Sequence, residues 1–201
     1  MTALQTAIKK VLALAPLSWL KLGKPRLNAE LTEHLTRSEQ ALGFVRPGQM
    51  VFSHLPEMFL AQERLAATLL IDGDDGSLSR IERELIAVVV SVENSCTSCI
   101  FGHAAQLRRL SGDAVWAGSI EANYRHAALT PRQRALADYA SKLTRTPAEM
   151  EPSDLQRLRD AGLKEIEILE AGCVAAYFNM SNRLNSSVGV KGHPQAYLSY
   201  R

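Results

Sequence analysis

Apolar residues recur at the three- to four-residue spacing of an amphipathic helix along most of the chain. Two of these stretches begin with a capping box, in which two residues three positions apart cap each other's backbone N–H groups. Ser79 and Glu82 form the first pair, and Thr130 and Gln133 form the second, with Pro131 at the first helical position. The pattern therefore predicts one helix that starts at Ser79 and another that starts at Thr130.

The same spacing predicts four further helices. A short helix starts at Ser153 and stops at Gly162, because glycine favours the left-handed conformation that ends helices. A long helix follows over residues 164–186, and two earlier helices cover residues 28–42 and 56–71. We expect the inner face of the long helix to carry Ile166, Leu169, Cys173, Ala176 and Tyr177.

The run Leu-Ile-Ala-Val-Val-Val-Ser-Val at residues 85–92 could form a buried strand, because β-branched residues favour sheets. The capping box before it and the lack of a partner strand favour a buried helix instead. Residues 72–77, rich in Asp and Gly, indicate a loop, and residues 46–49 indicate a turn. The chain is thus predicted to be all-α, with one helical domain over residues 28–201 behind an extension over residues 1–27.

The extension is basic and contains no acidic residue before residue 30. Residues 11–20 resemble the apolar region of a signal peptide, but Lys-Leu-Gly-Lys-Pro-Arg follows where a cleavage site of small residues would be expected. We therefore expect an amphipathic segment that is either mobile or packed on the surface. A removed signal is the alternative, and weak membrane contact stays open.

The amino-acid composition argues against several classes of protein. Apolar residues make up 46% of the 201 residues, which argues against disorder. The formal net charge is only +2, which argues against a dedicated nucleic-acid binder. Three cysteines are too few for a disulfide-stapled secreted domain, and no apolar run could span a bilayer. We expect a cytoplasmic protein without stable membrane insertion.

Two of the three cysteines lie close together, in Cys96-Thr-Ser-Cys99, and His103 follows. If Cys96 opens a helix, all three side chains fall on one face. A helix N-terminus favours a thiolate, and an imidazole one turn away can accept the thiol proton. A second thiol can then close a disulfide with the oxidised sulfur. The pattern indicates redox chemistry, with half of a zinc site or two inert buried cysteines as alternatives.

Three other features have two interpretations each. Glu84 either orients His103 from within the core or lies on the solvated side, where Arg80 or Arg83 screens it. Cys173 lies among small residues, which favours a packing role over chemistry. Residues 177–183 either cap the long helix or line a pocket, and residues 56–71 are expected to help shape that pocket.

The spacing of Glu84, Cys96, Cys99 and His103 resembles the core motif of the alkyl hydroperoxidase D-like branch of the carboxymuconolactone decarboxylase superfamily. The stretches at residues 129–140 and 175–184 are similar to its peroxidase-related subgroup. The resemblance covers residues 28–190. It implies an all-α helical-bundle fold that assembles as a trimer or hexamer, and thiol-dependent reduction of hydroperoxides.

Carried onto this chain, the resemblance makes Cys99 the peroxidatic thiol, activated by His103. Cys96 would be the resolving and more exposed thiol, and Glu84 would serve a proton relay through water. A dithiol donor, by resemblance a lipoyl protein, would reduce the resulting disulfide. No haem, flavin or nicotinamide fingerprint is visible, so no cofactor and no metal is expected.

The chain departs from the family pattern at one position. Ser98 stands where well-studied members have a histidine, which puts the efficiency of peroxide reduction in doubt. The decarboxylase branch lacks the cysteine pair, so lactone decarboxylation fits poorly. A general disulfide oxidoreductase or redox sensor, and a non-enzymatic oligomeric helical protein, are the alternative functions.

Overall fold

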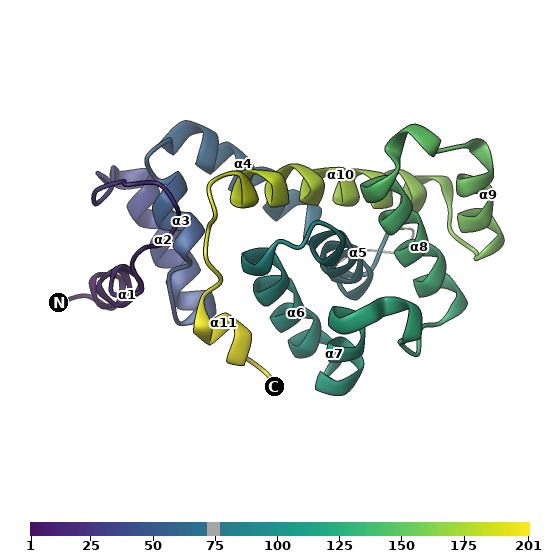
Figure 1. The fold of residues 1–201 in the computed structure, drawn as a ribbon, viewed down its shortest axis with the longest axis horizontal. Helices are drawn as coiled ribbons and strands as arrows, with labels where there is room; N and C mark the ends of the chain where they lie inside the picture. The colour runs from purple at the N-terminus through teal and green to yellow at the C-terminus, as the bar shows by residue number, and fades with distance from the viewer. Residues whose placement is uncertain (72–76) are drawn as a thin grey trace.

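A computed structural model describes residues 1–71 and 77–201. The described residues form helices and no β-strand, which confirms the all-α prediction (Figure 1). The α-helices are α1 (Ala3–Leu12), α2 (Ala29–Leu42), α3 (Pro47–Phe52), α4 (Pro56–Leu69), α5 (Arg80–Glu93), α6 (Thr97–Ser111), α7 (Ala114–Asn123), α8 (Pro131–Arg145), α9 (Pro152–Asp160), α10 (Glu165–Ser187) and α11 (Pro194–Leu198). Two short 3-10 helices, η1 (Tyr124–His126) and η2 (Pro147–Glu149), follow α7 and α8.

Both predicted capping boxes are present. The Ser79 backbone N–H donates to Glu82 at 2.8 Å at the start of α5, and the Thr130 N–H donates to Gln133 at 3.0 Å at the start of α8. The long helix and the two helices over residues 28–42 and 56–71 are also confirmed, within two residues at each end. The ambiguous run at residues 85–92 lies inside α5 and is helical.

Two local predictions need correction. The helix expected from Ser153 starts at Pro152, because the Glu151 backbone N–H donates to Asp154 and these two residues form the capping pair. The turn expected at residues 46–49 is the start of α3, with Pro47 at the first helical position. Gly162 does follow α9 in the left-handed conformation, with φ of 85°. The loop predicted at residues 72–77 falls mainly on residues 72–76, outside the described residues.

Helix α5 is the centre of the main core. Every residue from Glu82 to Ser91 is buried, and α6, α7, α8 and α10 surround the helix (Figure 1). A helix that is apolar on all sides is stable only when other elements cover it. Glu84 therefore projects from a scaffold element that is fixed on every side.

The inner face of α10 differs from the prediction. Ile168, Ala171, Val174, Ala175 and Phe178 are buried, and of the five residues expected on this face only Tyr177 is buried. Ile166, Leu169, Cys173 and Ala176 are exposed in the single chain. The helix carries apolar residues on both faces, so spacing alone does not identify the buried one.

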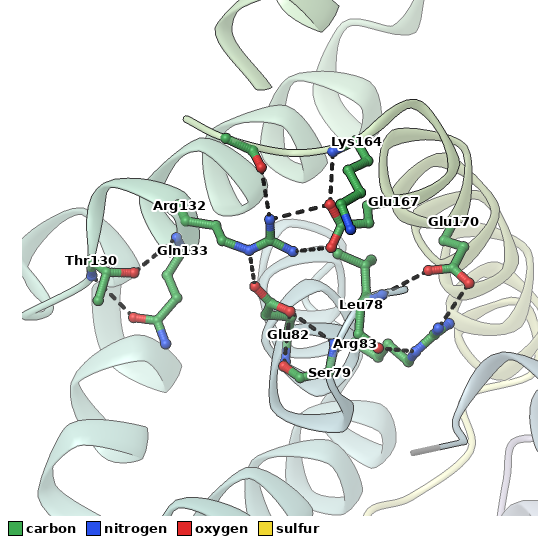
Figure 2. A network of polar contacts seen from close by, with 11 residues as sticks. Leu78, Ser79, Glu82, Arg83, Thr130, Arg132, Gln133, Lys164, Glu167 and Glu170 are labelled. Atoms are coloured by element: carbon green, nitrogen blue, oxygen red, sulfur yellow. Dashed lines mark hydrogen bonds and ion pairs between the residues drawn. The ribbon is translucent and has the colours of Figure 1, made fainter. Parts of the chain in front are cut away.

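A polar network anchors the start of α5 to α8 and α10. Figure 2 shows Arg132 between Glu82 and Glu167, with N–O distances of 2.5 and 2.6 Å. Burial alone would raise the pKa of Glu82, but the hydrogen bonds from Arg132 and Ser79 lower it. Hydrogen bonding to Arg132 also lowers the pKa of Glu167. Both carboxylates therefore stay ionised at neutral pH. The network fixes the N-terminal end of α5, the helix that carries Glu84.

The extension at residues 1–27 is packed rather than loose. Helix α1 buries Leu4, Ile8 and Val11 against Leu35 of α2 and Met50 of α3. Its Thr2 and Gln5 form a capping box. These N-terminal helices thus have a small core separate from the one around α5. None of the helices within residues 1–71 and 77–201 is both long and apolar enough to cross a membrane.

Candidate active site

The cysteine pair lies at the start of α6. Cys96 is the residue that caps the helix, and Cys99 occupies its third position. The two form a disulfide, with their Cα atoms 5.4 Å apart. The Ser98 hydroxyl lies 3.5 Å from the Cys96 Sγ and 3.8 Å from the Cys99 Sγ. The position that differs from the family pattern therefore places a hydroxyl beside both sulfurs.

The two cysteines differ in exposure, in the opposite sense to the prediction. Cys96 is 3% exposed and Cys99 is 8% exposed, so Cys96 is not the more accessible residue of the single chain. Cys99 lines a large cavity, whereas Cys96 is not among the residues that line it. Cys96 lies at the end of the short connection between α5 and α6, where its side chain is buried. Cys99 is the sulfur that a small molecule in the cavity would meet.

Glu84 and His103 form a direct pair. Glu84 is fully buried on α5, and its Oε2 accepts a hydrogen bond from the His103 Nδ1 of α6 at 2.8 Å. Its other oxygen, Oε1, accepts from the Arg80 Nη2 at 2.8 Å. The interpretation that Glu84 faces His103 from within the core is confirmed, and the solvated position is wrong, although Arg80 does pair with the carboxylate.

The charge state of this pair sets the histidine tautomer. Burial alone would raise the pKa of Glu84, but His103 and Arg80 outweigh burial and hold the pKa below its ordinary value. An ionised carboxylate only accepts hydrogen bonds, so the proton of His103 lies on Nδ1. Nε2 is then the ring nitrogen that can accept a proton. The ring also packs edge-on against Phe178 of α10, with centroids 4.5 Å apart.

A cavity of about 820 Å³ adjoins these residues. One wall comes from α5, α6 and α10, and includes Glu84, Cys99 and His103. The opposite side comes from α2, α3 and α4, which confirms that residues 56–71 help shape the pocket. Tyr177 and Phe178 also line it, so the start of the 177–183 segment is a pocket wall.

The sequence predicts Arg80 only as a screen of a solvated Glu84, and Phe178 only within a segment that caps a helix or lines a pocket. Their contacts with the Glu84–His103 pair are not predicted. The four-residue spacing between Arg80 and Glu84 is the usual spacing of a helical ion pair, and it could have indicated the first contact. No comparable sequence signal connects Phe178 to His103, because the two residues are 75 positions apart. The zinc alternative needs a cluster of ligands, and no group of three or more His, Cys, Asp or Glu within the described residues is placed to hold a metal ion.

These observations define the class of the molecule: an all-α protein with a cysteine pair at a helix start and a buried Glu–His pair beside the same cavity. A model of the carboxymuconolactone decarboxylase family matches residues 56–140. No curated protein matches the chain in sequence. Solved structures do match it, over nearly its whole length.

An uncharacterized peroxidase-related protein from Silicibacter sp. TM1040 is 32% identical, with a TM-score of 0.86, and the alignment covers 92% of this chain and 97% of that one. The alkylhydroperoxidase AhpD core protein from Ralstonia eutropha JMP134, also an uncharacterized peroxidase-related protein, is 28% identical, with a TM-score of 0.85 and the same coverage. The debrominase Bmp8 shares the fold at 17% identity and a TM-score of 0.75, covering 91% of this chain and 98% of that one. The chain belongs to the carboxymuconolactone decarboxylase superfamily, which includes the alkyl hydroperoxidase D-like proteins.

Proposed function

We propose that the protein is a thiol peroxidase that reduces hydroperoxides with the Cys96–Cys99 dithiol. One observation carries the proposal: Cys99 and His103 line the same cavity, and Glu84 holds His103 in the tautomer whose free nitrogen can take a proton. Similarity to two peroxidase-related structures supports the reaction class. The family alone does not decide the activity, because it also contains decarboxylases.

The catalytic cycle begins with reduced cysteines. His103 accepts the Cys99 thiol proton on Nε2, and the thiolate attacks the outer oxygen of the hydroperoxide. The O–O bond breaks, Cys99 becomes a sulfenic acid, and the alkoxide takes the proton back from His103 and leaves as an alcohol. Cys96 then attacks the Cys99 sulfur, and a disulfide forms with loss of water.

The buried carboxylate assists without touching the peroxide. An imidazolium at His103 is stabilised by the Glu84 carboxylate 2.8 Å away, so proton transfer from Cys99 becomes more favourable. Arg80 keeps Glu84 ionised and in place through the second carboxylate oxygen. Ser98, within hydrogen-bond distance of both sulfurs, takes the place of the histidine of the family pattern as the polar neighbour of the thiols.

A dithiol donor completes the cycle by thiol–disulfide exchange, in which its two thiols are oxidised and Cys96 and Cys99 are reduced. By family resemblance this donor is a lipoyl protein. The proposal also includes a cytoplasmic location, where such thiols stay reduced between turnovers. It includes assembly of a trimer or hexamer, to which the exposed apolar side of α10 at Ile166 and Leu169 is suited.

A stopped-flow measurement tests the proposal. Fully reduced protein mixed with cumene hydroperoxide should oxidise at least about 100-fold faster than free cysteine at the same pH, because general acid–base catalysis contributes about that much. The control is protein alkylated at its cysteines before mixing, which should not react. A rate equal to that of free cysteine would contradict the peroxidase and leave a general disulfide oxidoreductase.

A further inference from the structure

The wall of the cavity that faces the cysteines carries a second Arg–Glu–His cluster. Glu63 of α4 accepts a hydrogen bond from the His34 Nε2 at 3.1 Å and pairs with the Arg46 Nη2 at 3.0 Å. Burial alone would raise the pKa of Glu63, but Arg46 and His34 together lower it to about 2. The cluster repeats the residue types of Arg80, Glu84 and His103, with His34 on α2, Glu63 on α4 and Arg46 capping α3. The mechanism above does not use it.

Unpartnered polar atoms are concentrated in this cavity. Within the described chain, four side-chain polar atoms are buried without a hydrogen-bond partner, and three of them belong to cavity-lining residues: the Arg46 Nε, the Gln62 Oε1 and the Arg80 Nε. Buried donors and acceptors are nearly always paired, so such atoms indicate a missing partner.

The charges that line the cavity favour an anion. Six cationic side chains and two carboxylates line it. Arg37 and Arg64 pair with exposed glutamates, whereas Arg109 and Lys191 have no carboxylate within ion-pair distance among the described residues. Both unpaired cations lie at exposed positions, where they attract an incoming anion.

The size and lining of the cavity favour a long, partly apolar molecule. Its volume of about 820 Å³ lies in the range of about 300–1,000 Å³ typical of sites for drug-sized ligands, far above what hydrogen peroxide needs. Aromatic rings extend between the two clusters: Phe59 packs edge-on against His34, and Phe178 packs edge-on against His103. Tyr177 lies between them in contact with Phe178, and its hydroxyl donates to the Gln62 carbonyl at 3.3 Å.

We propose that the cavity binds an organic hydroperoxide that carries a carboxylate, with the peroxide beside Cys99 and the carboxylate on Arg46. The carboxylate pairs with the accessible part of the Arg46 guanidinium, whose side chain is 41% exposed, and the apolar chain lies along the aromatic rings. The assignment of the ligand as a substrate rests on the proposed peroxidase function. The carboxylate site itself does not, because binding requires no chemistry at the thiols.

Calorimetric titration of the full chain tests the site with octanoate and octanamide, which have the same length and differ in charge. The native protein should bind octanoate at least about tenfold more tightly than octanamide, since hydrogen bonds between charged partners are the stronger ones. Arg46→Gln should bind the two within about twofold. Equal binding by the native protein, or retained discrimination by Arg46→Gln, would overturn the carboxylate site.

Two further variants keep the result interpretable. Arg159→Gln is the matched control, because Arg159 pairs with Glu165 at the surface and does not line the cavity; it should discriminate like the native protein. If Arg46→Gln fails to fold because Glu63 loses its partner, the double variant Arg46→Gln/Glu63→Gln removes both charges and should also lose discrimination. Retained discrimination in the double variant would overturn the proposal.

A kinetic measurement then links the site to turnover. The kcat/KM for a fatty-acid hydroperoxide should exceed that for its methyl ester, and Arg46→Gln should remove this preference. If neither compound is reduced but octanoate binds as expected, the peroxidase proposal fails and the carboxylate site stands. If both are reduced equally by the native protein, the peroxidase stands and the carboxylate preference is overturned.

Discussion

Cys99→Ser is expected to lower peroxide reduction by at least about 10³-fold, because the nucleophile is removed. Cys99 lines the cavity, and no other sulfur of residues 1–71 and 77–201 does. The measurement is the rate of hydroperoxide loss with an excess of a dithiol reductant. The structural cost should be small, since serine is close to cysteine in size.

Two matched variants separate the cysteines. Cys96→Ser should still consume one equivalent of hydroperoxide and retain a sulfenic acid on Cys99, but it should not turn over with a dithiol. Cys173→Ser should behave like the native protein, because Cys173 is exposed on α10 and does not line the cavity. Loss of the first oxidation step in Cys96→Ser, with that step retained in Cys99→Ser, would reverse the assigned order of the two thiols.

Glu84→Gln is expected to lower the rate of peroxide reduction by about 10- to 100-fold, as changes to the groups that orient a functional histidine do. Glutamine cannot stabilise an imidazolium at His103, and it allows the other ring tautomer. The variant should also be less stable by about 3 kcal/mol, because Arg80 and His103 lose a buried charge partner. Circular dichroism and urea unfolding, measured together with the rate, separate the two effects.

The stability effect should depend on pH in a defined direction. Because the pKa of Glu84 is lowered from its ordinary value of 4.5, its ionised form stabilises the folded state above pH 4.5. That contribution is lost as the pH falls through the lower folded-state pKa. The difference in unfolding free energy between the native protein and Glu84→Gln should therefore be full at pH 7 and should shrink below pH 4.5.

Glu82→Gln is the matched control for Glu84→Gln. It makes the same change two residues earlier on α5, at a buried carboxylate that pairs with Arg132 rather than with the site (Figure 2). It should reduce stability and leave the rate of peroxide reduction unchanged. An equal fall in rate for both variants would show that Glu84 acts on the scaffold and not through His103.

Helix starts were predictable from sequence because their signals are local. Each capping box needs only two residues three positions apart, and the pairs at Ser79 and Thr130 form as expected. The start of α9 was misplaced because its cap, Glu151, is not among the residue types that usually begin helices, whereas Ser153 is. The buried face of α10 was wrong because both faces carry apolar residues, and only the position of α5 decides which is covered.

The candidate site was predictable to a similar extent. The spacing within residues 96–103 predicted that Cys96 opens a helix that carries Cys99 and His103, and Cys96 does cap α6. The partner of Glu84 could not be decided from sequence, because a carboxylate in the first turns of a helix is common at exposed and buried positions alike. The cavity, and with it the cluster of His34, Arg46 and Glu63, depends on how α2 to α4 pack across from α6, and no local pattern encodes that arrangement.

The most direct test of the peroxidase mechanism is the product stoichiometry of a single turnover. Fully reduced native protein is mixed with one equivalent of cumene hydroperoxide, and the cumyl alcohol formed is counted against the Cys96–Cys99 linked peptide. One molecule of alcohol should form for each disulfide. A disulfide that forms without alcohol, or an alcohol that forms while Cys96 and Cys99 stay reduced, would contradict it.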